Sequence, residues 1–254
     1  MKSKFWTLYK KELVSARVFL LIFTGAILLW QLFLASKRNI WPSEALVALS
    51  WLPLAVLPLW VMWNAFNSFR HEWNGNTIYL LLSLPLQGWK ISLAKLLTVL
   101  SEFTFYTFII ICGNLLFFKP ELSLIIKELP IEITLSNIIS LGVKVYALYW
   151  FPIATLGVLI QFASLAGRLV ERFQGLLSAW VFFLSLWLVS RWTMLTSGAF
   201  KWVPDLSFTV LTTQNGISAQ QTLSVDTAPI IATLVMVVII FITGSWLVEH
   251  ELEV

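Results

Sequence analysis

The sequence predicts an all-α integral membrane protein in which six transmembrane helices form a single domain over residues 1–254. Two observations lead to this prediction. Of the 254 residues, 59% are hydrophobic and only 12% are charged, whereas a soluble globular domain carries about 25% charged residues. The apolar residues also gather into six long runs, each close to the roughly 20 residues that a helix needs to cross a bilayer. The mean hydropathy of +0.84 agrees with this class.

Ahead of the first run, residues 2–17 have the pattern of an amphipathic helix. Phe5, Leu8, Tyr9 and Leu13 recur at intervals of three and four residues, and lysines occupy other positions around the helix. A helix of this kind lies in the headgroup region of a bilayer with its apolar face inward. We expect an interfacial helix here; the alternative is a basic tail that only sets the topology.

The six transmembrane helices are expected at 18–36, 45–69, 96–118, 145–167, 173–192 and 227–248. Pro53 and Pro58 should kink the second of them, because proline removes a backbone hydrogen bond from a helix. An even number of spans places both termini on the same side of the membrane. The longest loops on the other side are 119–144 and 191–226, the second with turn residues at 203–205 and 214–216.

Lysine and arginine indicate which side is cytoplasmic. Ten of the 17 lie on the face that holds the N-terminus and seven on the other, with the strongest concentration ahead of the first span. Cytoplasmic segments of membrane proteins carry an excess of these residues. We therefore expect a multi-pass protein of the plasma membrane with both termini in the cytoplasm. The basic residues are explained by topology, so no nucleic-acid partner is expected.

The loop between the second and third spans is expected to form a short amphipathic helix on the cytoplasmic surface. It begins with polar residues, continues with apolar residues at helical spacing, and stops at Pro85. A segment held by a span on each side is suited to dock a soluble partner. Its candidate partner-binding residues are Arg70, Glu72, Trp73, Thr77, Leu81, Leu84 and Pro85.

No catalytic or metal motif accompanies this segment. His71-Glu72 begins like the zinc motif H-E-x-x-H, but Gly75 stands where the second histidine should be. The chain also lacks the phosphate-binding loop G-x-x-x-x-G-K-[ST], so no enzyme activity and no cofactor of its own are expected. Glu102 is the one carboxylate inside a span. Near the cytoplasmic boundary it could snorkel or pair as a structural charge; the alternative is a place in an ion or substrate path.

The chain resembles the permease subunit of the ABC type-2 transporter family. Members have an N-terminal helix of the Lys-Lys-Glu-Leu type, here Lys10–Leu13, ahead of six spans. Between the second and third spans they carry a coupling helix with the pattern E-x-x-x-x-T-x-x-x-L-L-S-L-P and a later lysine. The matching residues here are Glu72, Thr77, Leu81, Leu82, Ser83, Leu84, Pro85 and Lys95. This chain has Gln87-Gly88 after the proline, where many members have a Ser-Arg pair.

This resemblance implies the transmembrane half of an ATP-driven exporter. A separate nucleotide-binding subunit would hold ATP and Mg²⁺ and dock on the coupling helix at 70–85. A second permease chain, the same or related, would pair with this one. The alternatives from other classes are a six-span membrane scaffold and an intramembrane hydrolase, both without transport activity. The hydrolase would need paired Glu or His residues within the spans, where the sequence offers only Glu102.

Overall fold

The computed structural model describes residues 4–75, 86–128, 135–170, 173–214 and 217–250. Within these ranges, six helices are long and apolar enough to cross a membrane, which confirms a multi-pass membrane protein. The helices are α1 (Lys4–Ser36), α2 (Ser43–Ser50), α3 (Leu52–Asn74), α5 (Gly88–Phe117), α6 (Lys119–Glu128), α7 (Leu135–Ala166), α8 (Gln174–Thr196) and α9 (Ala228–His250). Two short 3₁₀ helices, η1 (Gly167–Leu169) and η2 (Ser197–Phe200), follow α7 and α8. Strands β1 (Leu206–Gln214) and β2 (Ile217–Val225) precede α9.

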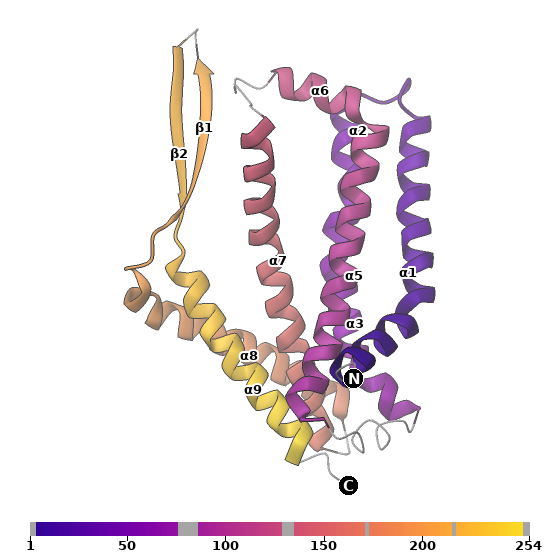
Figure 1. Ribbon diagram of the computed structural model, residues 1–254, viewed down its shortest axis with the longest axis vertical. Coiled ribbons are helices and arrows are strands. Elements are labelled where there is room, and N and C mark those ends of the chain that lie inside the picture. Colours follow the sequence, from indigo (N-terminus) through magenta and orange to yellow (C-terminus); the bar gives the residue numbers. More distant parts are fainter. Residues whose placement is uncertain (1–3, 76–85, 129–134, 171–172, 215–216, 251–254) are drawn as a thin grey trace.

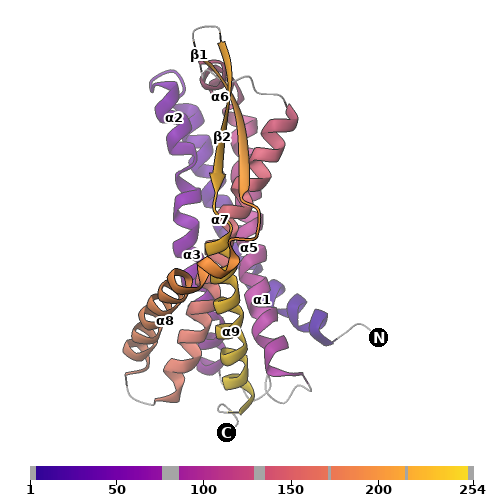
Figure 2. The ribbon, with the colours of Figure 1, turned by 90° about the vertical axis from the view of Figure 1, so that its left-hand side faces the viewer.

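Helices α5, α7 and most of α1 run along the long axis of the molecule, whereas α8 and α9 slant across it (Figure 1). We call the end at which α1 begins and α9 ends the basal end; α2, α6 and the two strands lie toward the opposite, hairpin end (Figures 1 and 2). On the expected topology, the basal end is the cytoplasmic one.

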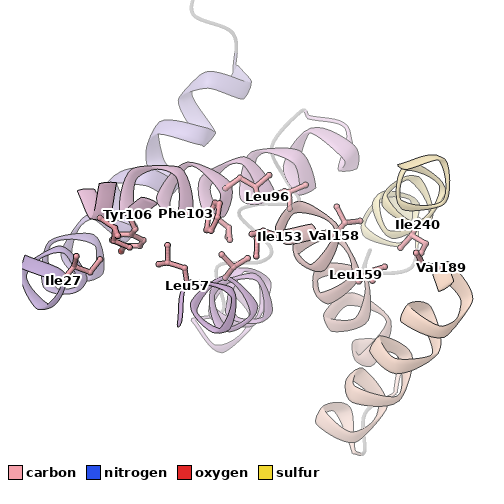
Figure 3. Close-up of a cluster of buried hydrophobic side chains, with 14 residues drawn as sticks. Ile27, Leu57, Leu96, Phe103, Tyr106, Ile153, Val158, Leu159, Val189 and Ile240 are labelled. Carbon is pink, nitrogen blue, oxygen red and sulfur yellow. The ribbon is translucent and has the colours of Figure 1, made fainter. Parts of the chain in front are cut away.

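Helix α5 is the centre of the bundle. In the most apolar 18-residue stretch of α5, 56% is buried inside the bundle, against 17–28% for the corresponding stretches of the other five spans. The other helices therefore surround α5. Its side chains Phe103 and Tyr106 are fully buried in a core that α1, α3, α7, α8 and α9 also enter (Figure 3). The outer faces of the surrounding helices remain apolar and exposed, as a lipid-facing surface requires.

The predicted interfacial helix and first span form one continuous helix, α1. No proline separates the two segments, so nothing in the sequence ends a helix at residue 17. The first turns of α1 nevertheless run at an angle to the rest of it (Figures 1 and 2). The limit expected at 17–18 between the interfacial helix and the first span is therefore not a helix end, and the interfacial position of the first turns stays a prediction.

The second and third spans also differ from their predicted limits. The helical chain of the second span is interrupted at Trp51, between α2 and α3, and Pro53 lies in the first turn of α3, where its missing N–H is tolerated. Pro58 lies inside α3. The third span begins at Gly88 instead of 96, so Lys95 lies within α5. The predicted limit was set at the last charge before the apolar run, but a charge that is paired inside the bundle does not end a helix.

The paired strands depart from the all-α expectation. β1 and β2 are antiparallel, with a register from Leu206 opposite Val225 to Gln214 opposite Ile217. The Lys144 ammonium of α7 donates a hydrogen bond to the carbonyl of Ser207 at 2.7 Å. The sequence contained the indication of a hairpin, since β-branched residues flank an Asn-Gly dipeptide at 215–216.

Candidate functional site

A buried lysine organises the basal end of the bundle. Lys95 is only 1% exposed, and its ammonium group donates to both carboxylate oxygens of Glu12 at 3.2 Å. It also donates to Glu72 Oε1 at 3.3 Å and to the carbonyl of Ser68 at 2.9 Å. A buried ammonium group is tolerated only when its charge is paired and its protons are bonded. These contacts meet that requirement.

A second lysine completes what we call the basal charge network, which consists of Lys11, Glu12, Glu72 and Lys95. The Lys11 ammonium lies 3.4 Å from Glu72 Oε1, and its side chain is 58% exposed. The network therefore has two positive and two negative groups and reaches from solvent to the interior. Because its members come from α1, α3 and α5, it joins three helices at one point.

Apolar and neutral polar contacts surround the network. Leu8, Phe69, Ile91 and Leu165 are buried together beside it, and the Lys95 ammonium lies 5.4 Å from the centre of the Phe69 ring. One turn ahead of Glu12 along α1, the Tyr9 hydroxyl and the Ser101 hydroxyl of α5 share a hydrogen bond of 2.7 Å. The first turns of α1 are thus fastened to the bundle by both charge and packing.

The structure describes three of the predicted partner-binding residues. Arg70, Glu72 and Trp73 lie in the last turns of α3, whereas Thr77, Leu81, Leu84 and Pro85 lie outside the described residues. Arg70 is exposed and Trp73 is half-buried, but Glu72 is 7% exposed. Glu72 lies near the C-terminal end of α3 and accepts hydrogen bonds from Lys11 and Lys95. Its carboxylate joins the end of α3 to α1 and α5, and its role in partner binding stays a prediction.

Glu102 pairs inside the bundle instead of snorkelling to the surface. It is 3% exposed, and its carboxylate accepts a hydrogen bond of 2.6 Å from the Asn64 amide of α3. This contact favours the structural interpretation of Glu102, as a polar link between the second and third spans. Asn64 was not singled out from the sequence, although a polar amide within the apolar run 45–69, which holds Asn64 and Asn67, is the signal that could have identified it.

The sequence analysis missed the pairing of Glu12 with Lys95. Both residues belong to the patterns that carry the family resemblance, yet they lie 83 positions apart, and only the packing of α1 against α5 brings them together. The signal available in the sequence was Lys95 itself, which stands directly before an apolar run with no proline to end a helix there.

No group of three His, Cys, Asp or Glu side chains that could hold a metal ion occurs in the part of the chain that the structure describes. Comparison of the chain with family models, with curated proteins and with solved structures gave no match. The function must therefore be argued from the residues and their arrangement.

Proposed function

We propose that this chain is the membrane-spanning permease subunit of an ATP-driven ABC exporter. A separate nucleotide-binding subunit binds ATP and Mg²⁺, hydrolyses the ATP, and docks on the segment 70–85 at the cytoplasmic surface. Two permease chains, identical or related, pair to form the transport path. The proposal rests on the family resemblance and on one structural observation, the basal charge network.

The network supports the proposal because it links the elements that such a mechanism has to move together. Glu72 lies near the start of the proposed docking segment, and Lys95 follows its end by ten residues. Glu12 belongs to the Lys-Lys-Glu-Leu pattern of α1. A displacement of the docking segment would act on α3 and α5 at once, and the pairing to Glu12 would pass it to α1. Partner binding can shift the population of two arrangements only through contacts that differ between them, and a paired network offers such contacts.

Co-purification with a nucleotide-binding subunit tests the docking step. The chain is co-expressed with candidate nucleotide-binding subunits from the same genome and captured through a tag. Leu84→Asp should lose the subunit, because it places a charge in the apolar contact that we propose for this segment. Glu72→Gln should keep it, because Glu72 faces the interior. A folded Leu84→Asp protein that retains the subunit would place the docking surface elsewhere and overturn this part of the proposal.

ATPase activity provides a second test. The purified chain alone should not hydrolyse ATP, since its sequence lacks a phosphate-binding loop, and activity should appear with the co-expressed subunit. Hydrolysis by the chain free of any other ATPase would contradict the permease assignment.

Cysteine labelling tests the proposed orientation. In a Cys112→Ser background, single cysteines at the hairpin end should react with a membrane-impermeant maleimide added to intact cells, and a cysteine at position 3 should not. Suitable hairpin-end positions are Ser43, Ser123 and Ser218. External labelling of position 3 would reverse the topology and place the docking segment on the wrong side for a cytoplasmic ATPase.

A further inference from the structure

Two arginines at the basal end face one small cavity. The cavity has a volume of about 130 Å³ and lies between the end of α3, the end of α7 with η1, and the start of α8; Arg70 and Arg168 both line it. The two side chains bring like charges to the same small space. Among the described residues, no carboxylate lies within ion-pair distance of either one. Positive charge is therefore concentrated here without a described counter-charge.

Neighbouring side chains hold these arginines in place. The Arg168 guanidinium lies 4.9 Å from the centre of the Trp73 ring and donates to the Gln174 side-chain oxygen at 2.8 Å. Arg70 lies 5.6 Å from the Phe66 ring. Stacking on an aromatic ring leaves the edge of a guanidinium group free to bind an anion through two parallel hydrogen bonds. The cavity thus has fixed donors suited to a phosphate group.

The start of α8 adds to this positive potential. Gln174 and Gly175, its first two residues, also line the cavity. The first N–H groups of a helix have no partner within the helix and carry a partial positive charge, which favours an anion there. This effect is secondary to the two full charges of the arginines.

A mostly apolar groove adjoins the cavity. It has a volume of about 390 Å³ and runs between α3, α7 and α8. Phe66, Gly175 and Ser178 line both spaces, so the two share a wall. The groove is otherwise lined mostly by apolar side chains, including Met62, Trp63 and Phe182. The positive cavity at the membrane surface thus continues into an apolar groove within the span. This arrangement matches a lipid in which an anionic headgroup is joined to an acyl chain.

We propose that the cleft between α3, α7 and α8 binds an anionic phospholipid, with its phosphate between Arg70 and Arg168 and an acyl chain in the groove. The lipid would neutralise the two like charges and fill a groove that packing leaves open. It would join the end of α3 to the start of α8, next to the basal charge network. This inference concerns lipid binding alone and does not depend on the transport function proposed above.

Lipid competition on the purified full-length chain tests the proposal. Phosphatidylglycerol or phosphatidylcholine is added to the protein in detergent micelles at equal mole fraction, and bound lipid is counted by native mass spectrometry. We expect phosphatidylglycerol to bind about 30-fold more tightly, since each basic residue near an anionic lipid contributes roughly fivefold. The double variant Arg70→Gln/Arg168→Gln should lose this preference. Arg191→Gln, the same change near the far end of α8, should keep it.

Two further arms separate a lipid site from a site for free phosphate. Ala179→Trp adds bulk at a position that lines the groove and does not line the arginine cavity, and it should lower phosphatidylglycerol binding at least tenfold. Inorganic phosphate at millimolar concentration should not displace the lipid from the wild type. If phosphate displaces it and Ala179→Trp has no effect, the site takes small anions and the proposal fails. Equal binding of the two lipids, or an unchanged preference in the double variant, would also overturn it.

The test does not depend on the folding of one variant. Arg168 packs on Trp73, so its replacement could weaken the fold, but Arg70 is exposed. Arg70→Gln alone should reduce the preference for phosphatidylglycerol about fivefold. Size-exclusion profile and circular dichroism establish that each variant is folded, and a folded Arg70→Gln protein with the full preference would contradict the site.

Discussion

Replacing Lys95 by methionine should destabilise the protein by about 3 kcal/mol. The substitution keeps most of the apolar stem but removes the charge that pairs with Glu12 and Glu72. Net hydrogen bonds to charged groups contribute about 1.5–3 kcal/mol each, and removing one partner of a buried ion pair costs about 3–5 kcal/mol. Glu72 would keep Lys11, and the Glu12 side chain is 15% exposed. Because the carboxylates are not left wholly unpaired, we expect the lower end of these ranges.

Thermal unfolding in detergent, followed by the fluorescence of the 14 tryptophans, measures this effect. A loss of about 3 kcal/mol corresponds to a decrease in Tm of roughly 6–12 °C for a chain of this size. Lys90→Met is the matched control, because Lys90 lies in the first turn of the same helix and no described carboxylate lies within ion-pair distance of it. It should change stability by less than about 0.5 kcal/mol.

A triple variant separates the charge effect from packing. Lys95→Met combined with Glu12→Gln and Glu72→Gln leaves no unpaired carboxylate, and neutral replacement of a buried ion pair is often neutral or stabilising. We expect its Tm to return most of the way to the wild-type value. If Lys95→Met alone leaves Tm unchanged, or the triple variant is less stable than the single one, the network does not have the energetic role argued above.

Three other substitutions test the packing of α1 against α5 and the pairing at the hairpin end. Gly113→Ala should lower stability by about 1–3 kcal/mol, because a Cβ there would lie 1.8 Å from the Gln31 side-chain oxygen. Gly25→Ala is the control: nothing lies within 4 Å of the added carbon, so it should be neutral or stabilising by up to about 1 kcal/mol. If Gly113→Ala and Gly25→Ala lower Tm equally, the close contact with Gln31 is not the cause. Burial alone would raise the pKa of Glu121, but hydrogen bonds and charge from Arg38 lower the pKa overall. Since the folded-state pKa is the lower one, the pair stabilises the protein above pH 4.5 and loses this effect as pH falls through the folded-state value. Glu121→Gln should therefore cost about 1 kcal/mol at pH 7 and nothing in strong acid, and a difference in Tm that persists at low pH would contradict the assignment.

Hydrophobicity along the chain was enough to predict the membrane class and the number of spans. A bilayer offers no partner for unpaired backbone groups, so each long apolar run has to form a helix whatever its neighbours are. That constraint is local, and a local pattern can be read from the sequence. The same reasoning failed at the span limits, because it treated Lys95 and residue 17 as boundaries. Both lie within continuous helices.

The arrangement of the candidate sites depends on tertiary structure. Glu12, Glu72 and Lys95 were visible as parts of a family pattern, but their pairing requires α1 and α3 to pack against α5 at the basal end. Arg70 and Arg168 are 98 positions apart and line one cavity only because α3 and α7 are neighbours. Helix formation in a membrane follows from the backbone's need for hydrogen bonds, which each segment meets alone. Which charged side chains meet is decided by helix packing, and packing depends on the shapes of all six helices together.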